Sequence, residues 1–122
     1  MKKDLRSLIH EVGGEDALYN VLLEFYQAMS TDTMIGFFFT GKDLAQVARK
    51  QQEFILKAAG LRENYEGKNP ANAHLALPPI LAGHFDRRLK VLEETLRKKG
   101  LQEPSVRTWI SFENAFRAVV QK

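Results

Sequence analysis

Cysteine is absent from this sequence of 122 residues, and proline, histidine and tryptophan are scarce, with four, three and one copies. The absence of cysteine excludes disulfide bonds, thiolate ligands to iron and zinc sites of the cysteine type. It also fits a reducing compartment. With three histidines, the simplest metal site available to the chain is one that needs a single imidazole.

The sequence also lacks a long apolar run and a strong excess of charge. Met1 to Asp4 lead into a charged amphipathic stretch that resembles neither a signal peptide nor a membrane span, so we expect a cytoplasmic protein that does not associate with membranes. Lysine and arginine exceed aspartate and glutamate by 18 to 15 and are spread along the chain. This argues against nucleic acid as a partner, and a small basic nucleic-acid-binding module is the weakest alternative.

Apolar content is ample for folding. Hydrophobic residues make up 44% of the chain, and eight phenylalanines are among its aromatic residues. A chain of this length suffices for one hydrophobic core but not for two. We therefore expect residues 1–122 to form a single domain.

Apolar residues recur at helical spacing almost throughout, and no hairpin dipeptide separates alternating runs. The pattern predicts an all-α fold. Gly13-Gly14 gives the backbone freedom for a corner between the first two helices, Asp43 suits a helix N-cap, and Pro104 suits the first turn of the last helix. The predicted helices cover about residues 5–12, 15–29, 44–59, 81–99 and from 103 onward, with a short turn near 71–77.

Two segments carry more specific expectations. Met34 to Phe39 is too apolar for a surface loop and too short for a normal helix, so we predict a tight turn that points its aromatic rings inward. Gln51 lies on the predicted inner face of the third helix. An unpartnered buried amide costs on the order of 1 to 3 kcal/mol, so Gln51 lies either at the edge of that face or opposite a polar group. Trp109 is expected to anchor the last helix in the core.

His74 stands in the segment Tyr65-x-Gly67-x₆-His74, just before the apolar run 75–81. From spacing alone, a histidine beside a proline-rich loop is more often a surface or capping residue than a ligand. A haem iron, however, needs only one protein imidazole and a pocket with apolar walls. The residues alone leave both interpretations open. His10 and His84 are expected at the surface.

Six segments follow one another in an order and with gaps that resemble a known family. They are Gly13-Gly14-Glu15-x-Ala17-Leu18, Phe25-Tyr26, Phe38-Phe39-x-Gly41-x-Asp43-Leu44, Lys50-Gln51-x-Glu53-Phe54, Tyr65-x-Gly67-x₆-His74 and His84-Phe85-Asp86. Together they resemble the truncated haemoglobins, the short two-over-two globins, over about residues 12–101. The resemblance implies a globin-like two-over-two helical sandwich that binds haem b.

The resemblance also implies roles for individual residues. His74 would be the proximal ligand of the haem iron, and Tyr26 and Gln51 would be distal groups that hydrogen-bond a ligand on that iron. Further contacts with haem are implied for Phe39 and Phe85 against the porphyrin, Val47 at the gate near the haem edge, Ile55 on the ligand route, and a cation for the propionates from Arg49, Lys50, Lys57 or Lys68.

Family likeness implies several activities: binding or sensing of dioxygen, nitric oxide dioxygenation to nitrate, or chemistry with peroxide or sulfide. A catalytic cycle would require an external reductase, because the chain has no flavin or nicotinamide motif. We expect a monomer or a weak homodimer. The alternative is a haem-free globin fold that serves in signalling or protein interaction, although His74, Tyr26, Gln51 and Phe39 together argue against it.

The chain departs from the family pattern at three places. The gap from His74 to Phe85 is one residue longer and contains Pro78-Pro79, and Ala59-Gly60 stands where many members have two glycines. Arg88 stands where one subgroup has tryptophan and others an apolar residue. We expect Arg88 to face solvent, since Leu89 can take the inner position. If it faced inward, it would add a charged donor to the distal site or reach a propionate.

Overall fold

The computed structural model describes residues 2–62 and 81–116. These residues form the α-helices α1 (Lys2–Val12), α2 (Glu15–Ser30), α3 (Leu44–Ala58), α5 (Ala82–Lys98) and α6 (Glu103–Asn114), together with the short 3₁₀-helix η1 (Gly36–Phe39). Within these two ranges there is no strand, so the all-α prediction is confirmed. None of the helices described is long and apolar enough to cross a membrane. The short turn expected near 71–77 lies outside the described residues.

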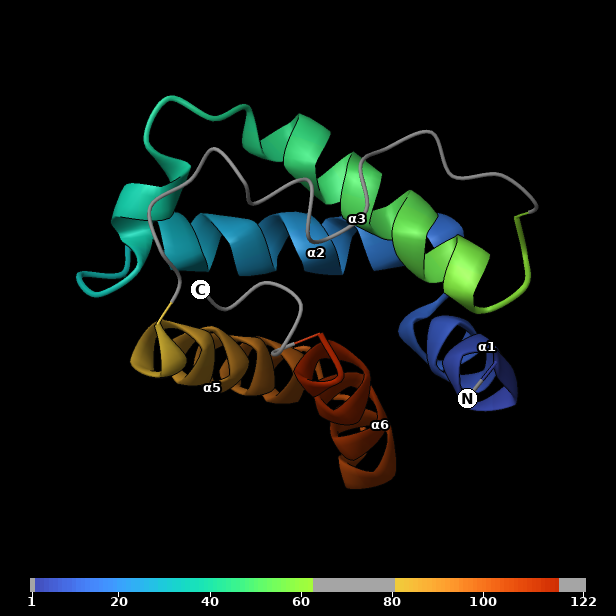
Figure 1. Cartoon of the computed structure of the whole chain (residues 1–122). Helices are drawn as coiled ribbons and strands as arrows, with labels where there is room; N and C mark the ends of the chain where they lie inside the picture. Colours follow the sequence, from blue (N-terminus) through green and yellow to red (C-terminus); the bar gives the residue numbers. More distant parts are fainter. Residues whose placement is uncertain (1, 63–80, 117–122) are drawn as a thin grey trace.

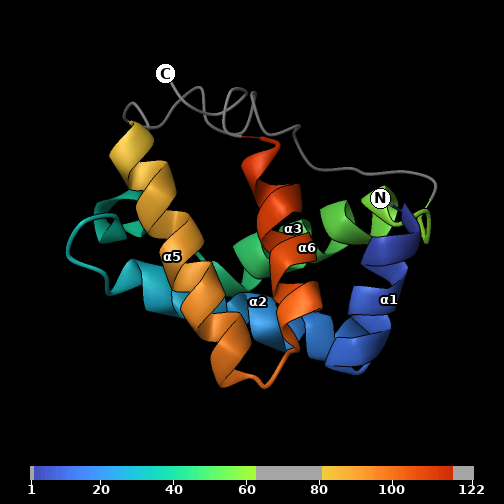
Figure 2. The same cartoon turned by 90° about the horizontal axis from the view of Figure 1, so that it is seen from below.

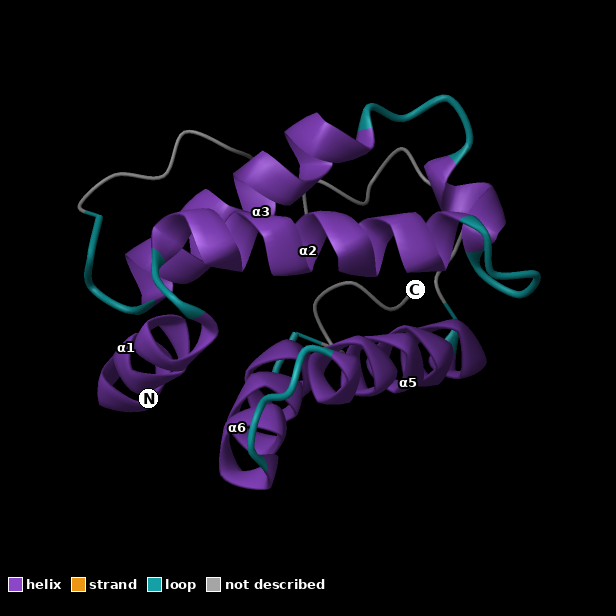
Figure 3. Cartoon of the chain, turned by 180° about the vertical axis from the view of Figure 1, so that it is seen from behind, coloured by secondary structure: helices purple, strands orange, loops and turns teal. Residues whose placement is uncertain are grey.

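The helices form two layers (Figure 1). Helix α2 packs against α3 in one layer, and α5 packs against α6 in the other. The layers meet where α2 contacts α5, while α1 flanks both and touches α2, α3 and α6. Figure 3 shows the same two pairs from behind, with loops at the corners. This is the predicted two-over-two helical sandwich.

The layers also meet through aromatic rings on α3, on α6 and just after the end of α6. The ring of Phe54 lies 6.1 Å from that of Phe112 and 5.3 Å from that of Phe116, measured between centroids. Figure 2 shows α6 lying across α3 when the molecule is seen from below. Trp109, on the same helix as Phe112, is 1% exposed. It therefore anchors α6 in the core, as predicted.

Local sequence explains the helix boundaries. Gly13 and Gly14 have φ angles of 113° and 102°, a region that side chains with a Cβ rarely adopt, so the sharp corner between α1 and α2 depends on glycine. The Asp43 carboxylate accepts a hydrogen bond from the Gln46 backbone N–H at 3.3 Å and caps α3. Pro104 stands in the first turn of α6, where its missing N–H costs nothing.

The η1 segment corrects one expectation. Phe38 is buried and Phe39 half-buried, but Phe37 is 48% exposed. The prediction that all these rings point inward was therefore wrong for Phe37. A 3₁₀-helix has about three residues per turn, so three consecutive side chains point in three directions and cannot all face the core.

Helix α3 turns a different face inward from the one predicted. Gln52, not Gln51, is the deeply buried glutamine, with 3% exposure, and its amide donates to the Glu15 carbonyl at 2.7 Å. Its side-chain oxygen accepts a hydrogen bond from Arg49 at 2.8 Å. Gln52 thus ties α3 to the start of α2. The buried positions of α3 and its C-cap are Ala48, Gln52, Ile55, Leu56 and Ala59.

Candidate functional site

Tyr26 lies at the centre of the candidate site, on the face of α2 that points to the core. It is 4% exposed, and its ring lies 5.2 Å from that of Phe25 and 5.8 Å from that of Phe39. Burial raises the pKa of the Tyr26 hydroxyl, the positive charge of Arg88 opposes this rise, and the negative charge of Glu113 adds to it. The phenol is therefore neutral at physiological pH and can donate a hydrogen bond.

Arg88 enters this site from α5, and the expectation that it faces solvent was wrong. Its Nη2 lies 3.0 Å and its Nε 3.3 Å from Oε2 of Glu113, and its side chain is 21% exposed. The reason is visible in the spacing, since Arg88 stands three residues after Phe85 and four before Leu92, and both of these are buried. Leu89 is only half-buried beside it. Arg88 thus shares the inner stripe of α5.

The charge of Arg88 is maintained by its partners. Burial lowers the pKa of the guanidinium, but the carboxylate of Glu113 and the hydroxyl of Tyr26 raise it by more, so the net direction is upward. The guanidinium carbon also lies 5.1 Å from the ring centre of Phe25 and 5.7 Å from that of Tyr26. Arg88 is therefore a permanent cation beside the tyrosine.

Glu113, on α6, is the shared acceptor of the cluster. It is 4% exposed; one carboxylate oxygen accepts from Arg88, and the other accepts from the Gln51 side-chain amide at 3.3 Å. Gln51 therefore faces a polar group, the second of the two alternatives left open for it. Sequence reasoning missed Glu113. The available signal was its spacing, four residues after Trp109 and three before Phe116.

The remaining predicted site residues divide by burial. Ile55 and Phe85 are buried at 1% and 3% exposure, Phe39 and Val47 are half-buried, and Lys50 is exposed. Arg49 lies with its guanidinium 3.8 Å from the ring centre of Tyr19 and also donates to Gln52. The predicted proximal ligand His74 lies outside the described residues, as do Tyr65, Gly67 and Lys68.

The two other histidines have separate surroundings. His10 is exposed, as expected. His84 is half-buried, and its Nδ1 accepts a hydrogen bond from the Leu81 backbone N–H at 3.1 Å. Its ring lies edge-on to those of Phe37 and Phe38, with centroids 5.6 Å and 5.3 Å away. His84 therefore caps the start of α5 and packs on η1.

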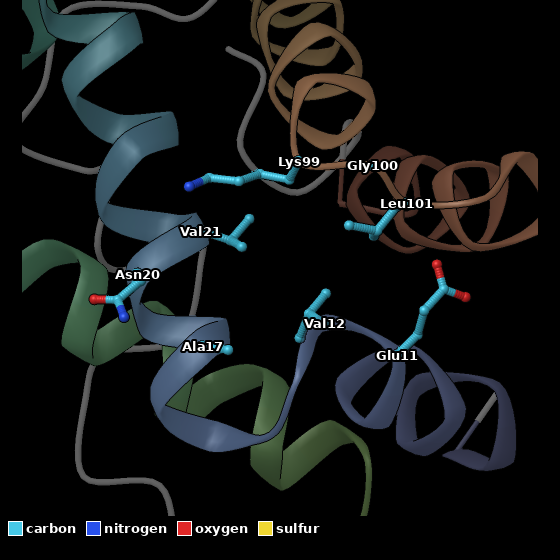
Figure 4. A pocket seen from close by; sticks show the side chains of 8 residues that line it. All are labelled: Glu11, Val12, Ala17, Asn20, Val21, Lys99, Gly100 and Leu101. Carbon is cyan, nitrogen blue, oxygen red and sulfur yellow. The ribbon is translucent and has the colours of Figure 1, made fainter.

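A surface cavity of about 280 Å³ lies away from this cluster, between the corner of α1 and α2 and the turn that joins α5 to α6 (Figure 4). Its two charged side chains already have partners. Glu11 accepts hydrogen bonds from Ser105 and the Gln102 backbone, and these bonds lower its pKa. Lys99 pairs with Glu24 at 2.5 Å. We therefore interpret this cavity as a gap between packed helices and not as a reactive site.

Comparison with known sequences identifies relatives over most of the chain. A model of the bacterial-like globin family matches residues 7–122. A group 1 truncated haemoglobin from Tetrahymena thermophila is 26% identical over 97 residues, which are 80% of this chain and 79% of that protein. Another, from Mycolicibacterium paratuberculosis, is 32% identical over 105 residues, which are 86% of this chain and 76% of that protein.

Comparison with solved structures gives the same fold. The truncated haemoglobin from Tetrahymena pyriformis in its Fe(III) form superposes with a TM-score of 0.82 at 24% identity, over 94% of this chain and 98% of that one. The two-over-two haemoglobin from a Synechococcus species, in the cyanomet state with covalently attached haem, gives 0.79 at 22% identity, over 93% and 96%. With the family match and the two-layer helical fold, these likenesses show that the chain belongs to the bacterial-like globin family and is a truncated, two-over-two globin.

Proposed function

We propose that this truncated globin binds haem b through His74 and reversibly binds dioxygen, or a related diatomic ligand, beside Tyr26 and Gln51. The observation that supports this most is the convergence of polar side chains from four helices on one part of the interior. Tyr26 comes from α2, Gln51 from α3, Arg88 from α5 and Glu113 from α6. A core that served only for folding would have little need of such a cluster, because burying polar and charged groups costs free energy.

The residues that the structure describes fit a haem. Phe39 lies against Tyr26, and Ile55 and Phe85 supply buried apolar surface nearby in the fold, as a porphyrin requires. The donors in the core are a phenol, an amide and a guanidinium, which suit a ligand that accumulates negative charge. In this proposal His74 would bind the iron, and these three groups would donate hydrogen bonds to the ligand on that iron.

Bound haem would supply an iron with one coordination position open to a diatomic ligand. The Tyr26 hydroxyl would donate a hydrogen bond to that ligand, and its neutral state leaves the proton available. The Gln51 amide would assist, since its side chain is already held at this side of the core by Glu113. Phe39, Val47 and Ile55 would exclude water, which strengthens these hydrogen bonds.

The propionates of haem would need cations at the mouth of the pocket. Lys50 is exposed on α3, one residue before Gln51, and is our candidate. Arg49 is a weaker candidate, because its guanidinium is already occupied by Tyr19 and Gln52. An exposed pair with a propionate would contribute little stability and would mainly orient the haem.

Binding of dioxygen is the activity we propose, and detoxification of nitric oxide or reactive oxygen species is its extension. Detoxification of nitric oxide or of reactive oxygen species would consume electrons in each cycle. The sequence carries no flavin or nicotinamide motif that could supply them. We therefore propose a separate reductase as partner for any catalytic cycle. We further propose that residues 1–122 act as one globin domain, as a monomer or a weak homodimer.

An optical titration tests the proposal. The purified protein is titrated with ferric haem, then reduced and exposed to carbon monoxide, in the natural sequence, in His74→Ala and in the control His10→Ala. We expect a sharp Soret band that saturates at one haem per chain in the natural sequence and in the control. His74→Ala should lose the spectrum of a histidine-ligated carbonyl complex.

Other results would redirect the interpretation. No saturable band in the natural sequence would favour the alternative, a haem-free globin fold that serves in signalling or protein interaction. An unchanged carbonyl spectrum in His74→Ala would assign the iron to another ligand. His84 would then be the next candidate to replace.

A further inference from the structure

In the cluster of Gln51, Arg88 and Glu113, the negative and positive charges face different helices. Oε1 of Glu113 accepts from Gln51 at 3.3 Å and Oε2 accepts from Arg88 at 3.0 Å, so the carboxylate lies between α3 and α5. The far side of the guanidinium points the other way. Its Nη1 lies 3.9 Å from the sulfur of Met29, and its carbon lies 5.7 Å from the ring centre of Tyr26. The positive end of the ion pair therefore faces α2.

The ion pair is also withdrawn from water. The side chains of Arg88 and Glu113 are 21% and 6% exposed. Charges in such surroundings act at longer range than charges on the surface, because little solvent screens them. The phenol of Tyr26 responds accordingly: after burial, the charge of Arg88 has the largest influence on its pKa, ahead of the opposite influence of Glu113. The net field at Tyr26 is therefore that of a nearby cation, weakened by its counter-ion.

We propose that Arg88 and Glu113 together determine the ligand specificity of this pocket. Arg88 places positive charge beside Tyr26 and so favours small anions over neutral diatomic ligands, while Glu113 holds Arg88 in position and limits that preference by neutralising part of its charge. This inference rests on the proposed function, since it requires a haem ligand beside Tyr26. The class of ligand that it adds is the small monovalent anion, for which azide is the probe.

Two measurements on the haem-loaded full chain distinguish an effect of charge at residues 88 and 113 from an effect of altered packing. The first is the ratio of azide affinity, measured on ferric protein, to carbon monoxide affinity, measured on ferrous protein. The second is the C–O stretching frequency of the carbonyl complex, because a positive field near the oxygen moves electron density from iron into the antibonding orbital of carbon monoxide and lowers the frequency. A change in packing alone would not move both in the direction set by the sign of the charge.

Glu113→Gln keeps the size and the hydrogen-bonding capacity of residue 113 but leaves Arg88 without a counter-ion. We expect it to raise the ratio of azide to carbon monoxide affinity by about tenfold or more and to lower the C–O frequency. Arg88→Met should do the reverse, because it leaves only the negative charge. The neutral double variant Arg88→Met with Glu113→Gln avoids an uncompensated buried charge and should show a lower affinity ratio and a higher frequency than the natural sequence.

Arg87→Met is the matched control, because it removes one positive charge from the next position of α5. The Arg87 guanidinium pairs with Asp32 at 2.6 Å, whereas Glu113 pairs with Arg88, so both readouts should stay at the natural values. The proposal is overturned if the double variant keeps the natural affinity ratio and frequency, or if Arg87→Met shifts them as much as Arg88→Met does. Failure of the natural sequence to bind haem would instead reject the proposed function.

Discussion

Arg88 and Glu113 form an ion pair that links α5 to α6 across 25 positions of the sequence, with Nη2 3.0 Å from Oε2 and both side chains largely withdrawn from solvent. Such a pair is expensive to bury and still more expensive to break, because the charge left behind has neither water nor partner. Single and double substitutions of the pair should therefore differ measurably in their free energy of unfolding.

We predict that Arg88→Met alone lowers the free energy of unfolding by about 3 to 5 kcal/mol. Combining it with Glu113→Gln should recover most of that loss, because no uncompensated charge then remains. Urea unfolding followed by circular dichroism measures both effects. Arg97→Met is the control on the same helix; its side chain is 47% exposed and pairs with the exposed Glu103, so its loss should cost far less stability than the loss of Arg88. A double variant as unstable as Arg88→Met would contradict the explanation.

Tyr26→Phe should accelerate the release of dioxygen from the haem-loaded protein. The substitution removes one hydroxyl and preserves the ring packing against Phe25 and Phe39. A hydrogen bond to a ligand that carries partial charge contributes about 1.5 to 3 kcal/mol, so the dissociation rate should rise about 10- to 100-fold. Stopped-flow spectroscopy measures it. Tyr19→Phe on the same helix is the control, and an unchanged rate in Tyr26→Phe would remove that hydroxyl from the mechanism.

Substitutions of the two neighbouring glutamines of α3 should have different effects, one mainly on stability and the other mainly on ligand release. Gln52 bonds to the Glu15 carbonyl and to Arg49, so Gln52→Leu strands polar groups at the contact between α2 and α3 and should destabilise the protein by about 1 to 3 kcal/mol. Gln51→Leu should cost less stability but should change the kinetics of ligand release. Measuring unfolding and dioxygen dissociation on both variants tests this division. If Gln52→Leu alone altered the ligand kinetics, the two assignments would be reversed.

Asp32 should contribute stability that depends on pH. Its carboxylate accepts from Arg87 and from the backbone N–H groups of Met34 and Ile35, and these bonds hold its pKa below the ordinary value of 3.8. A depressed pKa means that the stabilisation is fully present above that ordinary value and is lost as the pH falls through the folded-state pKa. The difference in unfolding free energy between the natural sequence and Asp32→Asn should therefore be large at pH 7 and shrink below about pH 4.

The partner of Asp32 provides an independent check of that pH dependence. Because Arg87 is the largest cause of the lowered pKa, Arg87→Met should flatten the acid side of the stability profile in the same way. Urea titrations between neutral and acid pH measure both variants. If the natural sequence and Asp32→Asn lost stability in parallel over the whole range, another carboxylate would be responsible for the acid sensitivity.

Helical periodicity predicted the layers of this fold well because most inner positions are apolar. Phe85, Leu92 and Trp109 are buried as their spacing indicates. The same rule could have placed Arg88 and Glu113 inside, since each lies three or four residues from buried neighbours. Spacing within one helix, however, does not show whether a charge has a partner there. Their opposite charges lie on different helices, and only the packing of α5 against α6 brings them together.

The boundaries of the apolar faces were harder to predict than the helices. On α3, Gln51 and Gln52 have the same chemistry, and a rotation of one residue, about 100° around the axis, decides which one is buried. At η1, the tighter 3₁₀ geometry turned Phe37 toward solvent. The proposal that His74 is the iron ligand rests on resemblance, because spacing alone does not distinguish it from a surface histidine.

The shared carboxylate of Glu113 also constrains how this globin can change over generations. Loss of either charge alone passes through a protein weakened by about 3 to 5 kcal/mol, a large part of the 5 to 15 kcal/mol that keeps a typical domain folded. Loss of both together is nearly neutral for folding. Descendants of this sequence should therefore keep arginine and glutamate at positions 88 and 113 or replace them as a pair, and lineages that lose the pair would acquire an interior of different polarity in the same step.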